Sequence, residues 1–135
     1  MTPETLVEMA KEAMLRADAP YSGYQVGSAL LSRDGRVYQG CNIENAAYGP
    51  TNCAERTAFF KAVYDGCRDF AAIAVCGGKD CVITGAFPPC GVCRQVMREF
   101  CEDDFVIYMV NETGYEAITL AELLPHSFSA KKHMQ

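Results

Sequence analysis

Two short cysteine motifs constrain the fold of this chain more than any other feature of its sequence. They are Cys53-Ala54-Glu55-Arg56 and Pro89-Cys90-Gly91-Val92-Cys93-Arg94, and each stands where a helix is expected to begin. The start of a helix carries partial positive charge, which lowers the pKa of a nearby thiol. Three thiolates at two such helix starts supply three corners of a tetrahedral zinc site. A fold that uses them must therefore bring both helix starts to one place.

The pattern of apolar runs and turn residues predicts one α/β domain over residues 1–135. Turn residues such as Arg33-Asp34-Gly35 separate the expected strands, and the short apolar run 70–76 is typical of a strand at the centre of a sheet. The expected strands are 25–32, 36–42, 70–76, 105–110 and 115–119, and the expected helices are about 3–18, 51–65, 91–101 and 120–124. A hairpin followed by strands that alternate with helices predicts a three-layer α/β/α fold with a mixed five-stranded sheet.

The composition excludes several classes of partner. The net charge is −5, with 12 basic residues against 17 acidic ones, so a nucleic-acid partner is disfavoured and Lys131 and Lys132 are interpreted as a solvated tail. No apolar run reaches the roughly 18 residues of a membrane span. The first residues lack the basic start and apolar stretch of a signal peptide. We therefore expect a soluble, cytoplasmic protein that acts on a small molecule.

The chain has eight cysteines, and they need to be assigned one by one. In a reducing compartment they indicate metal binding, catalysis or small buried side chains rather than disulfides. Four of them are expected to fill the core because they lie in or beside regular elements: Cys41, Cys67, Cys76 and Cys101. Cys81 lies in a loop and could close the metal site as a fourth ligand. A structural zinc site and a redox pair formed by Cys90 and Cys93 are the alternatives to a catalytic centre.

Glu55 favours a catalytic centre with one open coordination position. A carboxylate beside the metal is what such a site needs in order to take a proton from water. The two histidines, His126 and His133, lie outside any ligand spacing. The alternative is that Glu55 is an ordinary acidic residue at a helix start, which would also be favourable there.

The motifs together resemble one known family. Cys-Ala-Glu-Arg followed by Pro-Cys-x-x-Cys resembles the zinc deaminases. The segments 42–48 (Asn-Ile-Glu-Asn-Ala-Ala-Tyr), 90–95 (Cys-Gly-Val-Cys-Arg-Gln) and 122–128 (Glu-Leu-Leu-Pro-His-Ser-Phe) look like the small homotetrameric cytidine deaminases. The resemblance spans nearly the whole chain, and it implies the cytidine deaminase fold.

The resemblance implies a reaction and a role for each motif residue. Cys53, Cys90 and Cys93 would bind one zinc ion per chain, with water or hydroxide as the fourth ligand. That hydroxide would attack C4 of cytidine or deoxycytidine. Glu55 would carry the proton first to ring N3 and then to the departing amine, giving ammonia and the uracil nucleoside. Such a hydrolase would serve the salvage or the catabolism of pyrimidine nucleosides.

The family match also implies substrate contacts. Asn42 and Glu44 match residues that hydrogen-bond the ribose, and Tyr24 takes the place of an aromatic residue that lines the base pocket. The substrate-binding set implied by the match is Asn42, Glu44, Tyr24, Ala54, Ala46, Tyr48 and Phe128. The loop from Ala46 to Tyr48 would cross a subunit interface, and Phe128 would reach a neighbouring subunit's site. If the match is set aside, turn, surface or packing roles account for these residues equally well.

Arg56 has an electrostatic reason to lie beside the cysteines. Three thiolates give a zinc site a net charge of −1, which weakens its pull on the proton of water. An arginine that donates hydrogen bonds to the sulfurs withdraws charge and restores that pull. Arg56, helped by Arg94, is therefore predicted to tune the charge of the zinc ligands.

Three rival functions remain open at this point. A deaminase that acts on cytosine within a polynucleotide would need basic and stacking surfaces, which this acidic chain lacks. A deaminase of aminoacyl-nucleoside antibiotics would share the three-cysteine site. A zinc-stabilised interaction module without catalysis would have a fourth cysteine ligand and no need of Glu55.

Overall fold

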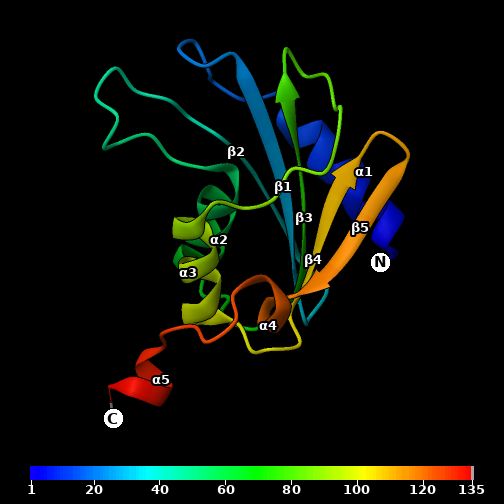
Figure 1. The fold of residues 1–135 in the computed structure, drawn as a ribbon. Helices are drawn as coiled ribbons and strands as arrows, with labels where there is room; N and C mark the ends of the chain where they lie inside the picture. The colour runs from blue at the N-terminus through cyan, green and yellow to red at the C-terminus, as the bar shows by residue number, and fades with distance from the viewer. Residues whose placement is uncertain (135) are drawn as a thin grey trace.

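The computed structural model describes residues 1–134, so Gln135, the last residue of the predicted domain, lies outside the described residues. The helices are α1 (Pro3–Met14), α2 (Ala54–Tyr64), α3 (Gly91–Phe100), α4 (Leu120–Leu123) and α5 (Ala130–His133). The strands are β1 (Tyr24–Ser32), β2 (Val37–Cys41), β3 (Phe70–Lys79), β4 (Val106–Asn111) and β5 (Gly114–Thr119). The five strands form one sheet in the order β2-β1-β3-β4-β5, with α1 on one face and α2 and α3 on the other (Figure 1). The predicted fold class, with a mixed five-stranded sheet between helical layers, is confirmed.

The sheet topology decides where α2 and α3 begin. β3 and β4 are parallel, whereas the other neighbouring strands are antiparallel. Short connections join the end of α2 to the start of β3 and the end of α3 to the start of β4. Because two parallel strands start at the same edge of a sheet, both helices end at that edge and begin at the opposite one. Both cysteine motifs therefore reach the edge of the sheet where β3 ends.

Two glycines let the helices lie close against the sheet. A Cβ atom on Gly27 of β1 would lie 2.1 Å from the Ala10 carbonyl oxygen of α1. On the opposite face, a Cβ atom on Gly40 of β2 would lie 2.3 Å from the carbonyl oxygen of Ala54, the first residue of α2. Only glycine permits such an approach. The start of α2 is thereby fixed directly over the sheet.

The core has one part on each face of the sheet. On the side of α2 and α3, Phe59 is fully buried and its ring centroid lies 5.2 Å from that of Phe70 and 6.1 Å from that of Phe105. On the side of α1, Leu6 and Ala10 pack against apolar residues of the central strands. Most of β1 is buried, because helices cover both faces of the sheet there.

The order of the first nine elements is confirmed, but the predicted ends of α1 and β3 are wrong, and the structure has one helix that was not predicted. α1 ends at Met14 rather than near residue 18, because the chain turns there to form a backbone bridge between Asp18 and Ile43. β3 continues to Lys79 because β1 pairs with it along its whole length. The two lysines predicted as a solvated tail lie on the additional helix α5, whose N-terminal cap is Ser129. Among the described residues, no helix is long and apolar enough to cross a membrane.

Candidate active site

The three motif cysteines come together at the starts of α2 and α3. Cys53 is the N-cap of α2, Cys90 is the N-cap of α3, and Cys93 lies in the first turn of α3. The Sγ atom of Cys90 lies 3.8 Å from that of Cys53 and 3.5 Å from that of Cys93. Within residues 1–134 this is the only group of three potential metal ligands, and all its Sγ atoms lie within 4.8 Å of one another. Cys81, the possible fourth ligand, does not belong to the group.

The donor set fits a zinc ion. Three sulfur ligands are typical of zinc, and the cluster leaves one corner of a tetrahedron without a protein ligand among the described residues. A hydrogen bond from Cys93 lowers the pKa of Cys53 to about 5, and the Arg56 guanidinium acts in the same direction. The same hydrogen bond, together with burial, raises the pKa of Cys93. Cys53 therefore loses its proton readily whereas Cys93 holds its own, and a divalent cation that bound the sulfurs as thiolates would displace the remaining protons.

Glu55 lies beside the sulfur cluster and is almost completely buried, with 4% of its surface exposed. It occupies the first turn of α2, two residues after Cys53. The pKa of Glu55 is raised to about 7, chiefly by burial and to a lesser extent by the charge of Cys53, while the Cys93 thiol and Arg56 act in the opposite direction. A carboxyl group with a pKa near neutrality can both accept a proton and give it back.

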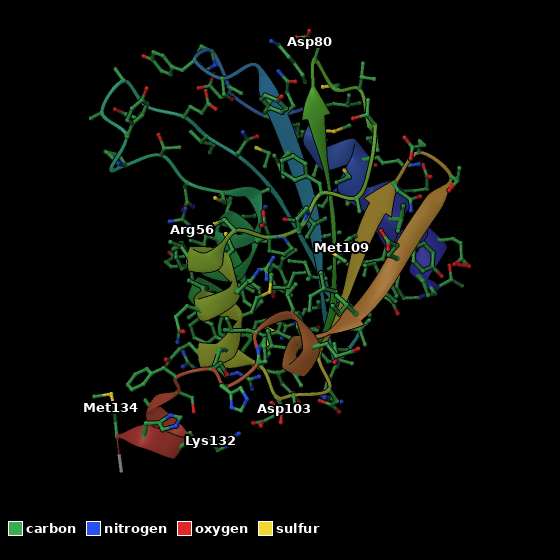
Figure 2. The ribbon with its side chains drawn as sticks, viewed as in Figure 1. Arg56, Asp80, Asp103, Met109, Lys132 and Met134 are labelled. Carbon is green, nitrogen blue, oxygen red and sulfur yellow. The ribbon has the colours of Figure 1, made fainter. Side chains whose placement is uncertain are left out.

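Arg56 contacts the sulfur cluster directly. Its Nη2 atom donates a hydrogen bond to Cys53 Sγ at 3.1 Å. Its Nε atom is buried, and no acceptor in residues 1–134 reaches it. Figure 2 shows Arg56 beside the upper ends of α2 and α3, where both helices begin. The Arg56 guanidinium therefore lies against the cysteine cluster and binds one of its sulfurs.

Arg94 differs from Arg56 in its contacts. Its Nε atom donates to the Pro89 carbonyl at 2.8 Å, and its Nη1 atom donates to the Leu123 carbonyl at 2.9 Å. These bonds fix the segment that precedes Cys90 and tie it to α4. Its charge lies near the cysteines, but its hydrogen bonds go to carbonyl oxygens rather than to sulfur. The expected help in tuning the sulfurs stays a prediction.

The expected sugar and base contacts form one hydrogen-bonded assembly. Asn42 Oδ1 accepts from the Val26 backbone N–H at 2.9 Å, and its Nδ2 donates to the Tyr24 carbonyl at 2.8 Å. The Tyr24 backbone N–H donates to Ser22 Oγ at 3.0 Å. Ser22 in turn donates its hydroxyl to the Glu44 carboxylate. Tyr24 is thus held beside Asn42 and Glu44, although it precedes Asn42 by 18 residues.

The Glu44 carboxylate is fixed by a turn that precedes β1. The backbone N–H groups of Tyr21 and Ser22 each donate to Glu44 Oε1 at 3.0 Å. These bonds and that of the Ser22 hydroxyl lower the pKa of Glu44, so the carboxylate is ionised and oriented. Tyr21, Ser22, Glu44 and Tyr48 line one hollow of about 160 Å³. No sequence pattern singles out Tyr21 and Ser22, although Pro20 and Gly23 indicate a turn around them.

A backbone bridge links the sugar assembly to the cysteines. Ile43, which lies between Asn42 and Glu44, exchanges backbone hydrogen bonds of 3.0 and 2.9 Å with Asn52, the residue before Cys53. The bridge closes the loop between Glu44 and Asn52, which projects from the body of the molecule in Figure 1. The Asn42 and Glu44 motif and the Cys53 motif therefore meet at one edge of the fold.

The remaining candidate residues fall into two groups. Ala54 is fully buried, and its carbonyl accepts a hydrogen bond from Ser28 Oγ at 2.9 Å, a contact that the sequence did not indicate. Ala46 and Tyr48 lie in the projecting loop, where 85% of the surface of Tyr48 is exposed. Phe128 is also exposed and stacks on His133 at 5.4 Å, away from the sulfur cluster of its own chain.

The comparisons with known proteins agree with this geometry. The family model for the cytidine and deoxycytidylate deaminase zinc-binding region matches residues 1–109. A cytidine deaminase of Sporosarcina psychrophila is 52% identical over 130 residues, which cover 96% of this chain and 93% of the relative. One of Halalkalibacterium halodurans is 50% identical over 132 residues, 97% of each chain. The crystal structure of a Burkholderia pseudomallei cytidine deaminase, 46% identical, superposes with a TM-score of 0.88 over 95% of this chain and 100% of that one.

Proposed function

The chain belongs to the cytidine deaminase family, and from this premise we propose how its own residues carry out the hydrolysis of cytidine and deoxycytidine to uridine and deoxyuridine. The reaction consumes one water molecule and releases one ammonia. The observation that carries the assignment is the buried Glu55 carboxyl beside three thiols that converge at two helix starts. A purely structural zinc module would need neither the carboxyl nor an open ligand position.

Cys53, Cys90 and Cys93 would hold the zinc ion. When bound, zinc supplies the Lewis acidity that makes water a nucleophile near neutral pH. The two helix dipoles and the Arg56 guanidinium stabilise the negative charge of the thiolates. The protein contributes a set of three sulfurs, graded from the exposed Cys90 to the buried Cys93, at the starts of two helices that pack on the sheet.

Glu55 is the proposed proton carrier of the reaction. Its carboxylate takes a proton from the attacking water and delivers it to ring N3, and a second transfer brings a proton to the departing amine. Burial supports this role because it raises the proton affinity of the carboxyl, so that the proton is held between the two transfers. The fixed position at the start of α2 keeps the carboxyl within reach of the reacting face.

Asn42, Glu44 and Tyr24 are the proposed contacts for the nucleoside. The turn at Tyr21 and Ser22 holds Glu44 ionised and oriented, so that its remaining lone pairs can accept from sugar hydroxyl groups. Both polar atoms of Asn42 already bind β1 backbone, and the second hydrogen on Nδ2 is available for the sugar. Ala54 and the exposed ring of Tyr24 complete the proposed contacts on this subunit.

We further propose that the chain, as one domain over residues 1–135, forms a homotetramer with shared active sites. Exposed aromatic side chains on the outer face of α2, Phe60 and Tyr64, support association, as do Tyr48 and Phe128. Ala46, Tyr48 and Phe128 would then contact the substrate of a neighbouring subunit. All eight cysteines are free thiols, which supports a reducing compartment and hence the cytoplasm.

Replacing Arg56 with alanine is expected to lower kcat about 10–100-fold while most of the zinc stays bound. Removal of the donor at 3.1 Å from Cys53 Sγ leaves more charge on the sulfurs, so the rising limb of the kcat–pH profile should move to higher pH. The measurements are zinc content by atomic absorption and kcat across pH. Arg16→Ala, which removes an arginine outside the site, is the matched control. Wild-type rates in Arg56→Ala would refute the role.

The assignment itself is tested by substrate choice. Purified zinc-loaded protein is incubated with cytidine, deoxycytidine and a cytosine-containing oligonucleotide, and the ultraviolet change on deamination is followed. We expect both nucleosides to be converted and the oligonucleotide to remain intact, since a chain with a net charge of −5 repels a polyanion. Conversion of the oligonucleotide alone would overturn the proposal in favour of a polynucleotide deaminase.

A further inference from the structure

The two histidines of this chain line one hollow near its C-terminus. His126 follows α4, and His133 belongs to α5. The hollow has a volume of about 360 Å³, and Arg98, Lys132, Asp103 and Ser127 also line it. This volume lies within the range of about 300–1,000 Å³ that is usual for small-molecule sites. The hollow lies at the end of α3, away from its start, where the cysteines are.

Arg98 is the buried member of this group. Its side chain is 6% exposed, Nη2 binds Asp103 Oδ1 at 2.8 Å, and Nη1 reaches the Cys101 carbonyl only at 3.5 Å. Its Nε atom is buried and has no hydrogen-bond partner among the described residues. A buried guanidinium with an unpaired N–H group costs free energy, because that group has given up its hydrogen bonds to water and has gained none in the protein. Arg98, whose side chain lines the hollow, therefore keeps one guanidinium N–H without an acceptor among the described residues.

Lys132 adds a second cation from α5. Among residues 1–134 its ammonium group forms no ion pair, whereas that of the neighbouring Lys131 lies 3.1 Å from Glu102. Figure 2 shows Lys132 and Asp103 at the same end of the molecule, beside α5 and α4. Among the described residues Asp103 is the only carboxylate that lines this hollow, and it is already paired with Arg98. The lining therefore carries net positive charge in a chain whose net charge is −5.

We propose that the hollow between α3, α4 and α5 is a binding site for a phosphate group, held by Arg98, Lys132 and the two histidines. Guanidinium, ammonium, imidazole and hydroxyl donors together match the several oxygens of a phosphate. Neither the cysteines nor the sugar assembly contribute to this site. The proposed site binds an anion, whereas the deaminase site binds an uncharged nucleoside.

The only two imidazoles of the chain provide a direct readout. Untagged, zinc-loaded protein is titrated at constant ionic strength and pH with inorganic phosphate, with adenosine monophosphate and with chloride, and the imidazole C–H signals are followed by proton NMR. We expect both histidines to shift with saturation for a phosphate-bearing ligand and not for chloride. A tighter response to the nucleotide identifies a nucleotide phosphoryl group as the ligand, and equal responses identify free phosphate. Linear shifts that chloride reproduces would overturn the proposal.

Substitutions of residues in and beside the hollow test whether phosphate binds there. Lys132→Ala is expected to weaken phosphate binding about tenfold, as the loss of one charge-assisted contact does. Lys131→Ala removes the same charge one residue away and should change the affinity for phosphate less than twofold. His126 has a φ of 53°, so His126→Asn removes the imidazole with a residue that tolerates this backbone, and it should also weaken binding. Equal effects of the two lysine variants would show general charge attraction and refute the site.

Discussion

Replacing Glu55 with glutamine is expected to lower kcat for cytidine by about 10²–10⁴-fold, the usual contribution of a general acid–base group. Glutamine has nearly the same shape and fills the same buried place at the start of α2. An amide, however, neither accepts a proton from water nor carries one to the ring. The zinc content should stay near one per chain, because the three sulfurs are unchanged.

Two controls separate the role of Glu55 from a general effect of losing a carboxylate. Glu122→Gln makes the same chemical change in the exposed capping box of α4 and should leave kcat within twofold of the wild type. Zinc analysis and circular dichroism of Glu55→Gln distinguish a catalytic loss from a loss of metal or fold. A zinc-loaded, folded Glu55→Gln protein that turns over at the wild-type rate would remove Glu55 from the mechanism.

The start of α3 was predicted correctly and that of α2 to within three residues, because local sequence determines where a helix begins. Cys53 follows a loop rich in Asn, Gly and Pro, and Cys90 follows two prolines, so both helices begin at a cysteine with extended backbone. The two motifs were expected to converge because both supply sulfur ligands for zinc. The parallel pairing of β3 with β4 explains how the fold brings them together. The grouping of Cys53, Cys90 and Cys93, with Glu55 buried beside it, agrees with the prediction from residue types.

Contacts between distant segments could not be predicted. The Tyr21 and Ser22 amides reach Glu44 only because the chain after α1 returns beside the segment that follows β2. Arg94 binds the carbonyl of Leu123, 29 residues further along, and no local pattern encodes that choice. α5 depends on the stacking of His133 on Phe128 and on the Ser129 cap, and four residues have too little periodicity to be recognised.

Cys93→Ala is expected to abolish zinc binding, and Cys101→Ala is its matched control. Both cysteines are buried and belong to the α3 segment, Cys93 in its first turn and Cys101 at its C-cap, so each variant deletes one sulfur from the interior. Only Cys93 lies within ligand distance of the other two sulfurs. Zinc per chain should fall from near one to below about a tenth in Cys93→Ala, with kcat falling about 10³-fold or more, because a site left with two sulfurs binds the ion weakly.

Thermal unfolding adds a readout that does not depend on activity. Zinc binds the folded chain and therefore raises its melting temperature, so a chelator should lower the Tm of the wild type and of Cys101→Ala. The Tm of Cys93→Ala should be lower at the outset and insensitive to the chelator, because no zinc remains to be withdrawn. If Cys93→Ala instead kept one zinc per chain and a chelator-sensitive Tm, another residue would have to complete the site. The deaminase centre would then need a different set of ligands.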